Sequence, residues 1–244
     1  MKVHAILPVY NESKSAYDLI AAYAKLAQRS PYAIRLLVIN DTSRDDSESW
    51  ILKAKADFPQ LDLVYEAHPE NRGLTGALNT GLGLLGPMSP DDVVVTMDGD
   101  NTHNPMLIPA MVSKIEEGAD IVIASRYCEQ SRTAGLALGR VLLSHGARFL
   151  YGLRWRLHGV RDYTCLFRAY RQSVIARMLG RYKPANCLTE QGFACAGELL
   201  CKAASESDVI VEVPLILRYD RKVGASNMNV LKTAFNTLKM LARR

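Results

Sequence analysis

Short, unbroken apolar runs alternate with amphipathic segments through the first half of the chain. The runs predict five buried strands, at Val3–Val9, Ile34–Ile39, Leu61–Tyr65, Val93–Met97 and Ile121–Ala124. Between them, helices are predicted near 13–28, 47–56, 74–85 and 105–117. The first is capped by Ser13 and carries Ala16, Leu19, Tyr23 and Leu26 at three- and four-residue spacing. Unbroken Val, Ile and Leu strands that each lead into a helix are typical of a mostly parallel sheet with helices on both faces, so the fold class is predicted as α/β.

The pattern changes after residue 125. Further helices are expected at 136–153, 173–179 and 190–204, and strands at 164–170 and at 209–217, where Pro214 interrupts the run. No run approaches the ~18–20 apolar residues that a membrane span needs, so no transmembrane segment is expected. We predict one domain over 1–228, with halves 1–125 and 126–228, and a C-terminal amphipathic helix in 229–244.

The charges divide at the same place. Residues 1–125 hold 10 Lys and Arg against 17 Asp and Glu, whereas residues 126–244 hold 20 against 8. Such a division favours an acidic half that holds a cation and a basic half that meets phosphate or an anionic membrane surface. No interleaved aromatic pattern supports nucleic-acid binding. The five cysteines are odd in number and form no C-x-x-C, which indicates reduced thiols and a cytoplasmic protein.

The strongest chemical signal is the sequence Asp98-Gly99-Asp100, directly after the fourth predicted strand. Two carboxylates at this spacing can share a divalent cation with diphosphate oxygens, although an Asp-Gly pair can also simply form a turn. Polar residues also follow the first two strands, at Asn11–Glu12 and Asn40–Asp41. Since ligands of such sheets bind beyond the carboxyl ends of the strands, these three clusters should converge.

Seven short motifs occur in order along the chain. They are 7-LPVYNES-13, 39-INDTS-43, 71-NRGL-74, 97-MDGD-100, 124-ASRY-127, 167-FRAY-170 and the late pattern Arg221-x-x-Gly224-x-Ser226. Together they resemble family 2 glycosyltransferases of the GT-A fold, most of all the dolichyl- or polyprenyl-phosphate mannose (or glucose) synthases, over roughly residues 3–228. The resemblance implies an inverting transfer of a hexose from a GDP- or UDP-sugar to a polyprenyl or dolichyl phosphate, assisted by Mg²⁺ or Mn²⁺.

The resemblance also implies roles for single residues. Positions matching the nucleotide-sugar pocket are Pro8, Tyr10, Glu12, Ile39, Asp41, Asp98, Gly99, Asp100 and Arg221. The metal ligands would be Asp98 and Asp100, and the acceptor phosphate would be held by Arg126, Arg140 and Ser144. The residues expected to act in catalysis are Asp98, Asp100, Arg126 and Arg221. Taken singly, some have simpler explanations: Pro8 as a strand end, Tyr10 as core, Arg126 as a helix cap.

Three departures from the family pattern stand out. Asn40 occupies a position usually held by aspartate, and Asn227 one usually held by lysine. In the segment 162-DYTCLF-167, Leu166 takes the place of a glycine. These changes leave the fold and the donor class as expected but bear on which sugar nucleotide and acceptor are used.

The acceptor decides whether a base is needed. A lipid monophosphate, with a second pKa of about 6, is already largely ionised at neutral pH, whereas a hydroxyl acceptor must lose a proton to a base. In the second half, Glu198 and Asp162 are the acids to consider as that base, and Asp162 can equally pair with a local arginine. Two alternatives therefore stay open: the same donor chemistry on a soluble phosphate or hydroxyl acceptor, and a non-catalytic nucleotide-sugar-binding module.

The two basic amphipathic helices expected at 136–153 and 230–241 also have more than one interpretation. They can rest on an anionic leaflet, which would make the protein peripheral on the cytoplasmic membrane face. Equally, they can pack on the sheet or form a homodimer contact.

Overall fold

The computed structural model describes residues 1–135, 146, 150–155 and 157–221 of the 244. Within them, seven strands form a central sheet in the order β3-β2-β1-β4-β7-β5-β8. The strands are β1 (Lys2–Val9), β2 (Ala33–Asn40), β3 (Asp62–Ala67), β4 (Val93–Thr96), β5 (Ile121–Ser125), β7 (Arg168–Arg171) and β8 (Ile210–Pro214). A separate parallel pair joins β6 (Arg132–Ala134) to β9 (Ile216–Arg218).

The sheet is mostly parallel, as expected. Strand β1 runs parallel to both of its neighbours, β2 and β4, and β5 runs parallel to β8. Strand β7 is the exception, because it pairs antiparallel with both β4 and β5. This strand comes from the second half of the chain and separates two strands of the first half, so both halves contribute to one sheet.

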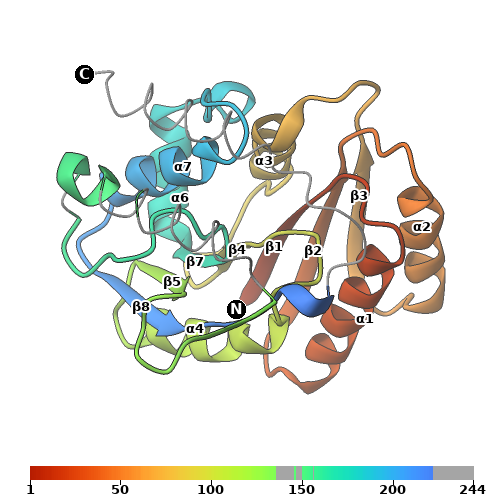
Figure 1. The fold of residues 1–244 in the computed structure, drawn as a ribbon, viewed down its shortest axis with the longest axis horizontal. Helices are drawn as coiled ribbons and strands as arrows, with labels where there is room; N and C mark the ends of the chain where they lie inside the picture. The colour runs from red at the N-terminus through yellow and green to blue at the C-terminus, as the bar shows by residue number, and fades with distance from the viewer. Residues whose placement is uncertain (136–145, 147–149, 156, 222–244) are drawn as a thin grey trace.

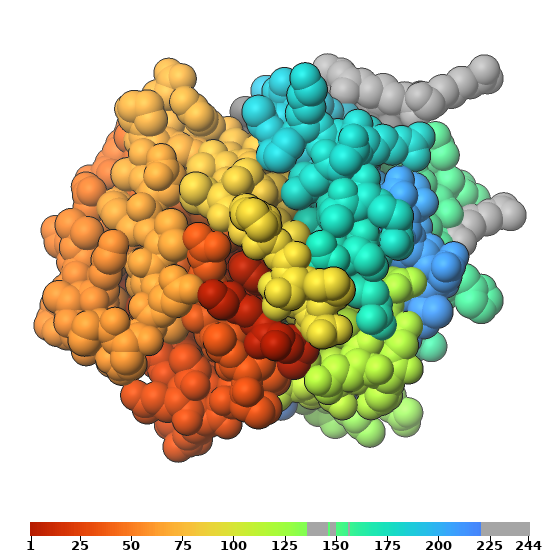
Figure 2. Space-filling model, turned by 180° about the vertical axis from the view of Figure 1, so that it is seen from behind, coloured from red at the N-terminus to blue at the C-terminus, as the bar shows by residue number. Residues whose placement is uncertain are grey.

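Helices cover both faces of the sheet (Figure 1). On one face α1 (Lys14–Arg29), α2 (Ser47–Asp57) and α4 (Ile108–Glu116) contribute to one apolar core. On the other, α3 (Gly73–Gly83), α6 (Gln172–Arg181) and α7 (Ala194–Ala204) contribute to a second. The strands in between are buried on both sides, which explains their unbroken apolar sequences. Seen from behind, the early part of the chain (red and orange) and the late part (cyan and blue) lie on opposite sides of the view, with a yellow segment between them (Figure 2).

Short 3₁₀ turns complete the described elements: η1 (Pro105–Leu107), η2 (Pro184–Asn186) and η3 (Tyr219–Arg221). The run expected as one strand at 209–217 is two strands, β8 and β9, which belong to different sheets. Pro214 ends the first of them, because proline offers no N–H to continue a ladder.

Ser13 lies at the N-cap of α1 as expected, but its side chain does not cap the helix. Its hydroxyl instead donates to Asp45 Oδ2 at 2.7 Å. Most of the helix predicted at 136–153, and all of the C-terminal helix, lie outside the described residues. None of the helices that the structure describes has the length and apolar character needed to cross a membrane.

Candidate active site

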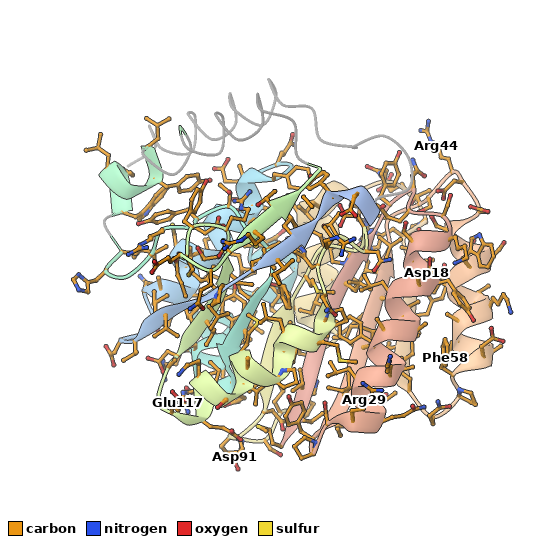
Figure 3. All side chains as sticks on the ribbon, turned by 60° about the horizontal axis from the view of Figure 1, so that its bottom comes forward. Asp18, Arg29, Arg44, Phe58, Asp91 and Glu117 are labelled. Atoms are coloured by element: carbon orange, nitrogen blue, oxygen red, sulfur yellow. The ribbon has the colours of Figure 1, made fainter. Side chains whose placement is uncertain are left out.

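The loops that follow β1, β2 and β4 all leave the same edge of the sheet. Val9 and Asn40 are partners in register, so β1 and β2 end level with each other. In Figure 3, Arg44 marks this edge, and Asp91 and Glu117 mark the opposite one, where β4 begins and α4 ends. The polar clusters predicted to converge therefore do lie together.

Gly99 fixes the position of the two aspartates against β1. A Cβ atom at Gly99 would lie 2.4 Å from the carbonyl oxygen of Pro8 and 3.0 Å from Val9 Cγ2. Glycine is therefore the residue that lets the Asp98–Asp100 loop approach the backbone of β1 so closely. The next residue, Asn101, has a φ of 59°, which turns the chain sharply after the pair.

Asp100 is buried and held by its own loop. Its Oδ1 accepts hydrogen bonds from Thr102 Oγ1 at 2.7 Å and from Thr102 N at 3.2 Å. The carbonyl of Thr102 accepts from the backbone N–H of Arg218, at the end of β9, at 3.0 Å. Because η3 follows directly, the backbone of Arg221 lies three residues from this contact, while its side chain lies outside what the structure describes.

The loops after β1 and β2 are bonded to each other. Ser47 Oγ accepts from the backbone N–H groups of Glu12 and Ser13, both at 2.8 Å. The N–H of Asn11 donates to Ser43 Oγ, and Asn11 Oδ1 accepts from the N–H of Arg44. Asn11 and Ser13 both have positive φ values, so these bonds hold a backbone shape that isolated residues rarely adopt.

Asp41 is buried at the end of β2, with its backbone N–H bonded to the carbonyl of Val9. Its Oδ1 accepts from His68 Nδ1 at 2.7 Å and from the N–H of Arg72 at 2.8 Å. Its Oδ2 receives no hydrogen bond from any described residue and is not fully enclosed by the protein, so it reaches solvent. Asp41 thus presents one oxygen to the outside of the protein.

Asn40, the first departure from the family pattern, has a local role. Its Nδ2 donates to Tyr65 Oη at 3.1 Å, and that hydroxyl donates to Glu48 Oε1 at 2.9 Å. Its Oδ1 accepts from the N–H of Ser43. An ionised aspartate could accept but not donate, so an amide at position 40 suits this series of hydrogen bonds, which ends on the carboxylate of Glu48.

Arg126 makes a buried ion pair with Asp162. Its Nη2 lies 2.6 Å from Asp162 Oδ1 and its Nε 2.8 Å from Oδ2, and Nη2 also donates to Thr164 Oγ1. Burial alone would raise the pKa of the Asp162 carboxyl, but the charge and hydrogen bonds of Arg126 outweigh it and lower that pKa. Of the alternatives for Asp162, the structure therefore shows the arginine partner. The Arg126 side chain is still 19% exposed, so a phosphate could reach it, and its role at the acceptor phosphate stays a prediction.

His103 lies between the aspartate loop and this ion pair. Its Nδ1 is 3.7 Å from Asp98 Oδ2, longer than a hydrogen bond, and its Nε2 is 4.0 Å from Cys165 Sγ. The ring packs on Phe167 with centroids 5.5 Å apart. Burial lowers the pKa of His103 to about 4, so the ring is neutral at pH 7.

Glu198, the other candidate base, is occupied. It accepts from the N–H groups of Thr189 and Glu190, from Thr189 Oγ1, and from Lys202 Nζ at 2.8 Å. With Asp162 paired to Arg126, both acids considered for proton abstraction are held in structural contacts. The geometry therefore favours an acceptor that arrives already ionised.

The remaining predicted site residues differ in position. Pro8, Tyr10 and Glu12 lie at or beyond the end of β1, and the Pro8 carbonyl faces Gly99 of the aspartate loop. The side chain of Ile39 is fully buried in the core beneath α3, so it supports the pocket from inside. Arg140 and Ser144 lie outside the described residues, and their assignment stays a prediction.

Two residues at the site were not singled out from the sequence. His68 follows β3 and bonds Asp41, and Thr102 holds Asp100. A lone histidine after a strand gives no distinctive signal in a single sequence. Thr102, two residues after Asp100, matches a common local turn in which a hydroxyl bonds a nearby carboxylate.

The aspartate pair suits a hard divalent cation. Carboxylate oxygens are the ligands that Mg²⁺ and Mn²⁺ prefer, and Mg²⁺ is commonly held by one or two carboxylates plus substrate phosphates. Over the described ranges, no group of three or more His, Cys, Asp or Glu side chains is placed to hold a metal unaided. Asp98 and Asp100 therefore fit a cation whose coordination a bound diphosphate completes.

Comparison with known families matches residues 5–179 to the model of "Glycosyl transferase family 2". The chain is 29% identical over 182 residues to an undecaprenyl-phosphate 4-deoxy-4-formamido-L-arabinose transferase of Enterobacter sp. (strain 638), covering 73% of this chain and 51% of that protein. It is 26% identical over 228 residues to the polyprenol monophosphomannose synthase of Mycolicibacterium smegmatis, covering 92% and 80%. The chain thus spans about half the length of the first relative and four fifths of the second.

Among solved structures, glucosyl-3-phosphoglycerate synthase from Mycobacterium tuberculosis has a similar fold. Its complex with Mn²⁺, UDP and glucosyl-3-phosphoglycerate superposes with a TM-score of 0.67 at 20% identity, over 99% of this chain and 77% of that one. Its complex with Mg²⁺ and UDP gives 0.66 at 20% identity, over 98% and 79%. At this identity the likeness concerns the fold.

Proposed function

The chain belongs to glycosyl transferase family 2 and has the GT-A fold, and from this premise we propose that it transfers a hexose from a nucleoside-diphosphate sugar to a polyprenyl phosphate. The observation that carries the proposal is the contact of Gly99 with the Pro8 carbonyl, which holds two carboxylates where the loops after β1, β2 and β4 meet. The acceptor class is supported by both relatives, whose names specify polyprenyl-type phosphates.

Each group at the site has a part in the proposed transfer. Asp41 would receive the base of the donor, and Asp98 and Asp100 would hold a divalent cation near its diphosphate. When bound, that cation supplies positive charge that stabilises the departing diphosphate. The oxygen of the acceptor phosphate forms a bond to the anomeric carbon as the bond to the diphosphate breaks. The nucleoside diphosphate leaves with the electron pair, and attack from the opposite face inverts the anomeric configuration.

No base is needed in this scheme. The acceptor phosphate is already largely ionised at pH 7, and the two acids considered as bases are bonded elsewhere. Arg126 pairs with Asp162, and both lie close enough to His103 to act on its charge, while His103 Nδ1 is 3.7 Å from Asp98 Oδ2. We assign Arg126, together with Arg221, to the phosphate groups of acceptor and donor.

The first experiment measures transfer of radiolabelled sugar from UDP- and GDP-sugars with Mn²⁺ or Mg²⁺. Polyprenyl phosphate is compared with a soluble phosphate and a hydroxyl acceptor. We expect product with polyprenyl phosphate, and a loss of about 100-fold or more in Asp100→Ala. Asp91→Ala is the matched control, because Asp91 is an exposed aspartate at the opposite edge of the sheet. Wild-type turnover in Asp100→Ala would refute the metal assignment, and product only with a soluble acceptor would refute the lipid assignment.

We also propose that the basic second half rests on an anionic leaflet while the protein reaches its lipid substrate. Residues 126–181 hold eleven arginines against two acids. Arg168 is buried and Arg126 is paired with Asp162, but Arg132, Arg154 and Arg161 are exposed, and these support the proposal. Flotation with anionic vesicles should recover the protein at low salt and lose it at high salt. No recovery at any salt, together with a dimeric mass in light scattering, would indicate a homodimer contact instead.

A further inference from the structure

The carboxylate of Asp41 is used unevenly. Oδ1 accepts from His68 Nδ1 at 2.7 Å and from the N–H of Arg72 at 2.8 Å, whereas Oδ2 receives no hydrogen bond from the described residues. The side chain is only 5% exposed, so a ligand meets it in one narrow direction. An ionised carboxylate has about four lone-pair sites, two on each oxygen. The two protein donors therefore fill the capacity of Oδ1.

We infer that Asp41, held by His68, selects a uracil base over guanine, so that the donor is a UDP-sugar. This inference rests on the proposed function, because it names the nucleotide that the same site takes. Uracil presents one imino N–H between two carbonyl groups, and one carboxylate oxygen satisfies it. Guanine presents an imino N–H beside an amino N–H, and this pair is satisfied when each carboxylate oxygen accepts one of them. With Oδ1 already filled, guanine leaves a donor unpaired on binding.

His68 is the positioning residue in this arrangement. Its Nε2 lies 2.9 Å from Thr80 Oγ1, and its backbone N–H and carbonyl bond Asn40 and Thr42. An ionised carboxylate only accepts, so Nδ1 must carry the proton that points at Asp41. A ring held at both nitrogens cannot swing away to release Oδ1 when a base arrives.

The backbone completes the same constraint. The N–H of Arg72 precedes α3, and Asn71 Nδ2 donates to the carbonyl of Asp41 at 3.0 Å. The aspartate is therefore fixed from the loop before α3 as well as from the end of β3. The direction from which a ligand can reach Asp41 Oδ2 is therefore set by the fold. A substitution at His68 changes the hydrogen bonding of Oδ1 without removing the carboxylate.

The test measures dissociation constants for UDP and GDP by calorimetry with saturating Mn²⁺. The full chain should bind UDP about tenfold or more tightly than GDP. In His68→Ala one lone pair of Oδ1 is released, so the ratio should shrink about fivefold or more. In His68→Asn the amide N–H can replace the Nδ1 donor, so the ratio should stay near that of the unsubstituted protein. A control is His4→Ala, since His4 also contacts a buried aspartate, Asp92, at 3.3 Å on the opposite edge.

The outcomes separate this inference from the proposed function. Failure to bind either nucleotide or to transfer sugar from either donor would overturn the proposed function. Sugar transfer with GDP bound as tightly as UDP, or more tightly, would overturn the uracil assignment alone. An unchanged ratio in a folded His68→Ala would overturn the role of His68. If that variant does not fold, His68→Leu, which fills the space but donates no hydrogen bond to Asp41, takes its place, and an unchanged ratio there would overturn the role of His68. A ratio that collapses in His4→Ala as well would show a general loss of structure and would also overturn it.

Discussion

Replacing Gly99 by alanine tests whether the contact between the aspartate loop and β1 is what makes the site. The added Cβ would lie 2.4 Å from the Pro8 carbonyl oxygen, whereas folded proteins rarely show such contacts under 3.0 Å. The obstacle is backbone in the sheet, so it cannot rotate away as a side chain could. The aspartate loop must therefore move outward by at least about 0.6 Å.

Two effects follow from that displacement. Overpacking against a rigid strand costs about 1–3 kcal/mol of the free energy of unfolding. A shift approaching 1 Å in groups that orient a reacting diphosphate lowers turnover by about 100-fold. We therefore expect Gly99→Ala to fold, with a lowered Tm, and to lose transfer activity far more than its stability loss would explain.

The assay combines thermal denaturation, which gives the Tm, with turnover measured well below that Tm, where the variant is fully folded. Gly180→Ala is the matched control, because Gly180 is within α6 and nothing beyond its chain neighbours and the helix's own backbone lies within 4 Å of the added Cβ. Alanine is favoured over glycine in a helix by about 1 kcal/mol, so this control should be as active as the unsubstituted protein and no less stable. Gly99→Ala with normal turnover and normal Tm would refute the argument that the close approach builds the site.

Three further predictions concern buried groups. Asp162→Asn leaves Arg126 without its counter-charge and should lower the free energy of unfolding at pH 7 by about 3–5 kcal/mol, measured by chemical denaturation. This loss should shrink as pH falls through the folded-state pKa of Asp162, and a variant as stable as the parent would contradict the pairing. The pKa of His103 is lowered to about 4, so between about pH 6.5 and pH 4 the unfolded chain binds more protons than the folded chain. The free energy of unfolding should therefore fall by a few kcal/mol as pH is lowered across that range. His103→Gln should flatten this part of the pH profile, and an unaltered profile would count against burial of a neutral ring. Gly197→Ala would place a Cβ 2.3 Å from Tyr151 Oη and should displace that ring, seen as a changed near-ultraviolet dichroism with a lower Tm, and an unchanged spectrum would be inconsistent with the contact.

The strands and the convergence of the site could be predicted because they depend on local patterns. Apolar runs such as Val93–Thr96 mark buried strands, and topology then brings their carboxyl ends to one edge. The place and direction of β7 could not be predicted in this way. Its residues have ordinary strand character, and its antiparallel pairing with both β4 and β5 depends on partners 45 to 78 residues away.

The roles of single side chains were harder to predict. A sequence indicates that Asp41 stands at a strand end, but not that His68 and Arg72 will fill one of its oxygens. Likewise, the sequence allows Asp162 to be either a catalytic base or an ion-pair partner, and the 2.6 Å contact between Arg126 Nη2 and Asp162 Oδ1 decides for the ion pair. Such choices depend on distances between separate elements, which residue spacing along the chain does not contain.

The position of β7 has a consequence for the order in which the molecule is made. A chain still on the ribosome that ends before residue 168 has β4 and β5 but lacks the strand that bridges them. The apolar flank of β5 must then wait, exposed or held by a chaperone, until some forty further residues have emerged. The first half therefore cannot mature as a free-standing fragment, and attempts to express it alone should yield aggregates.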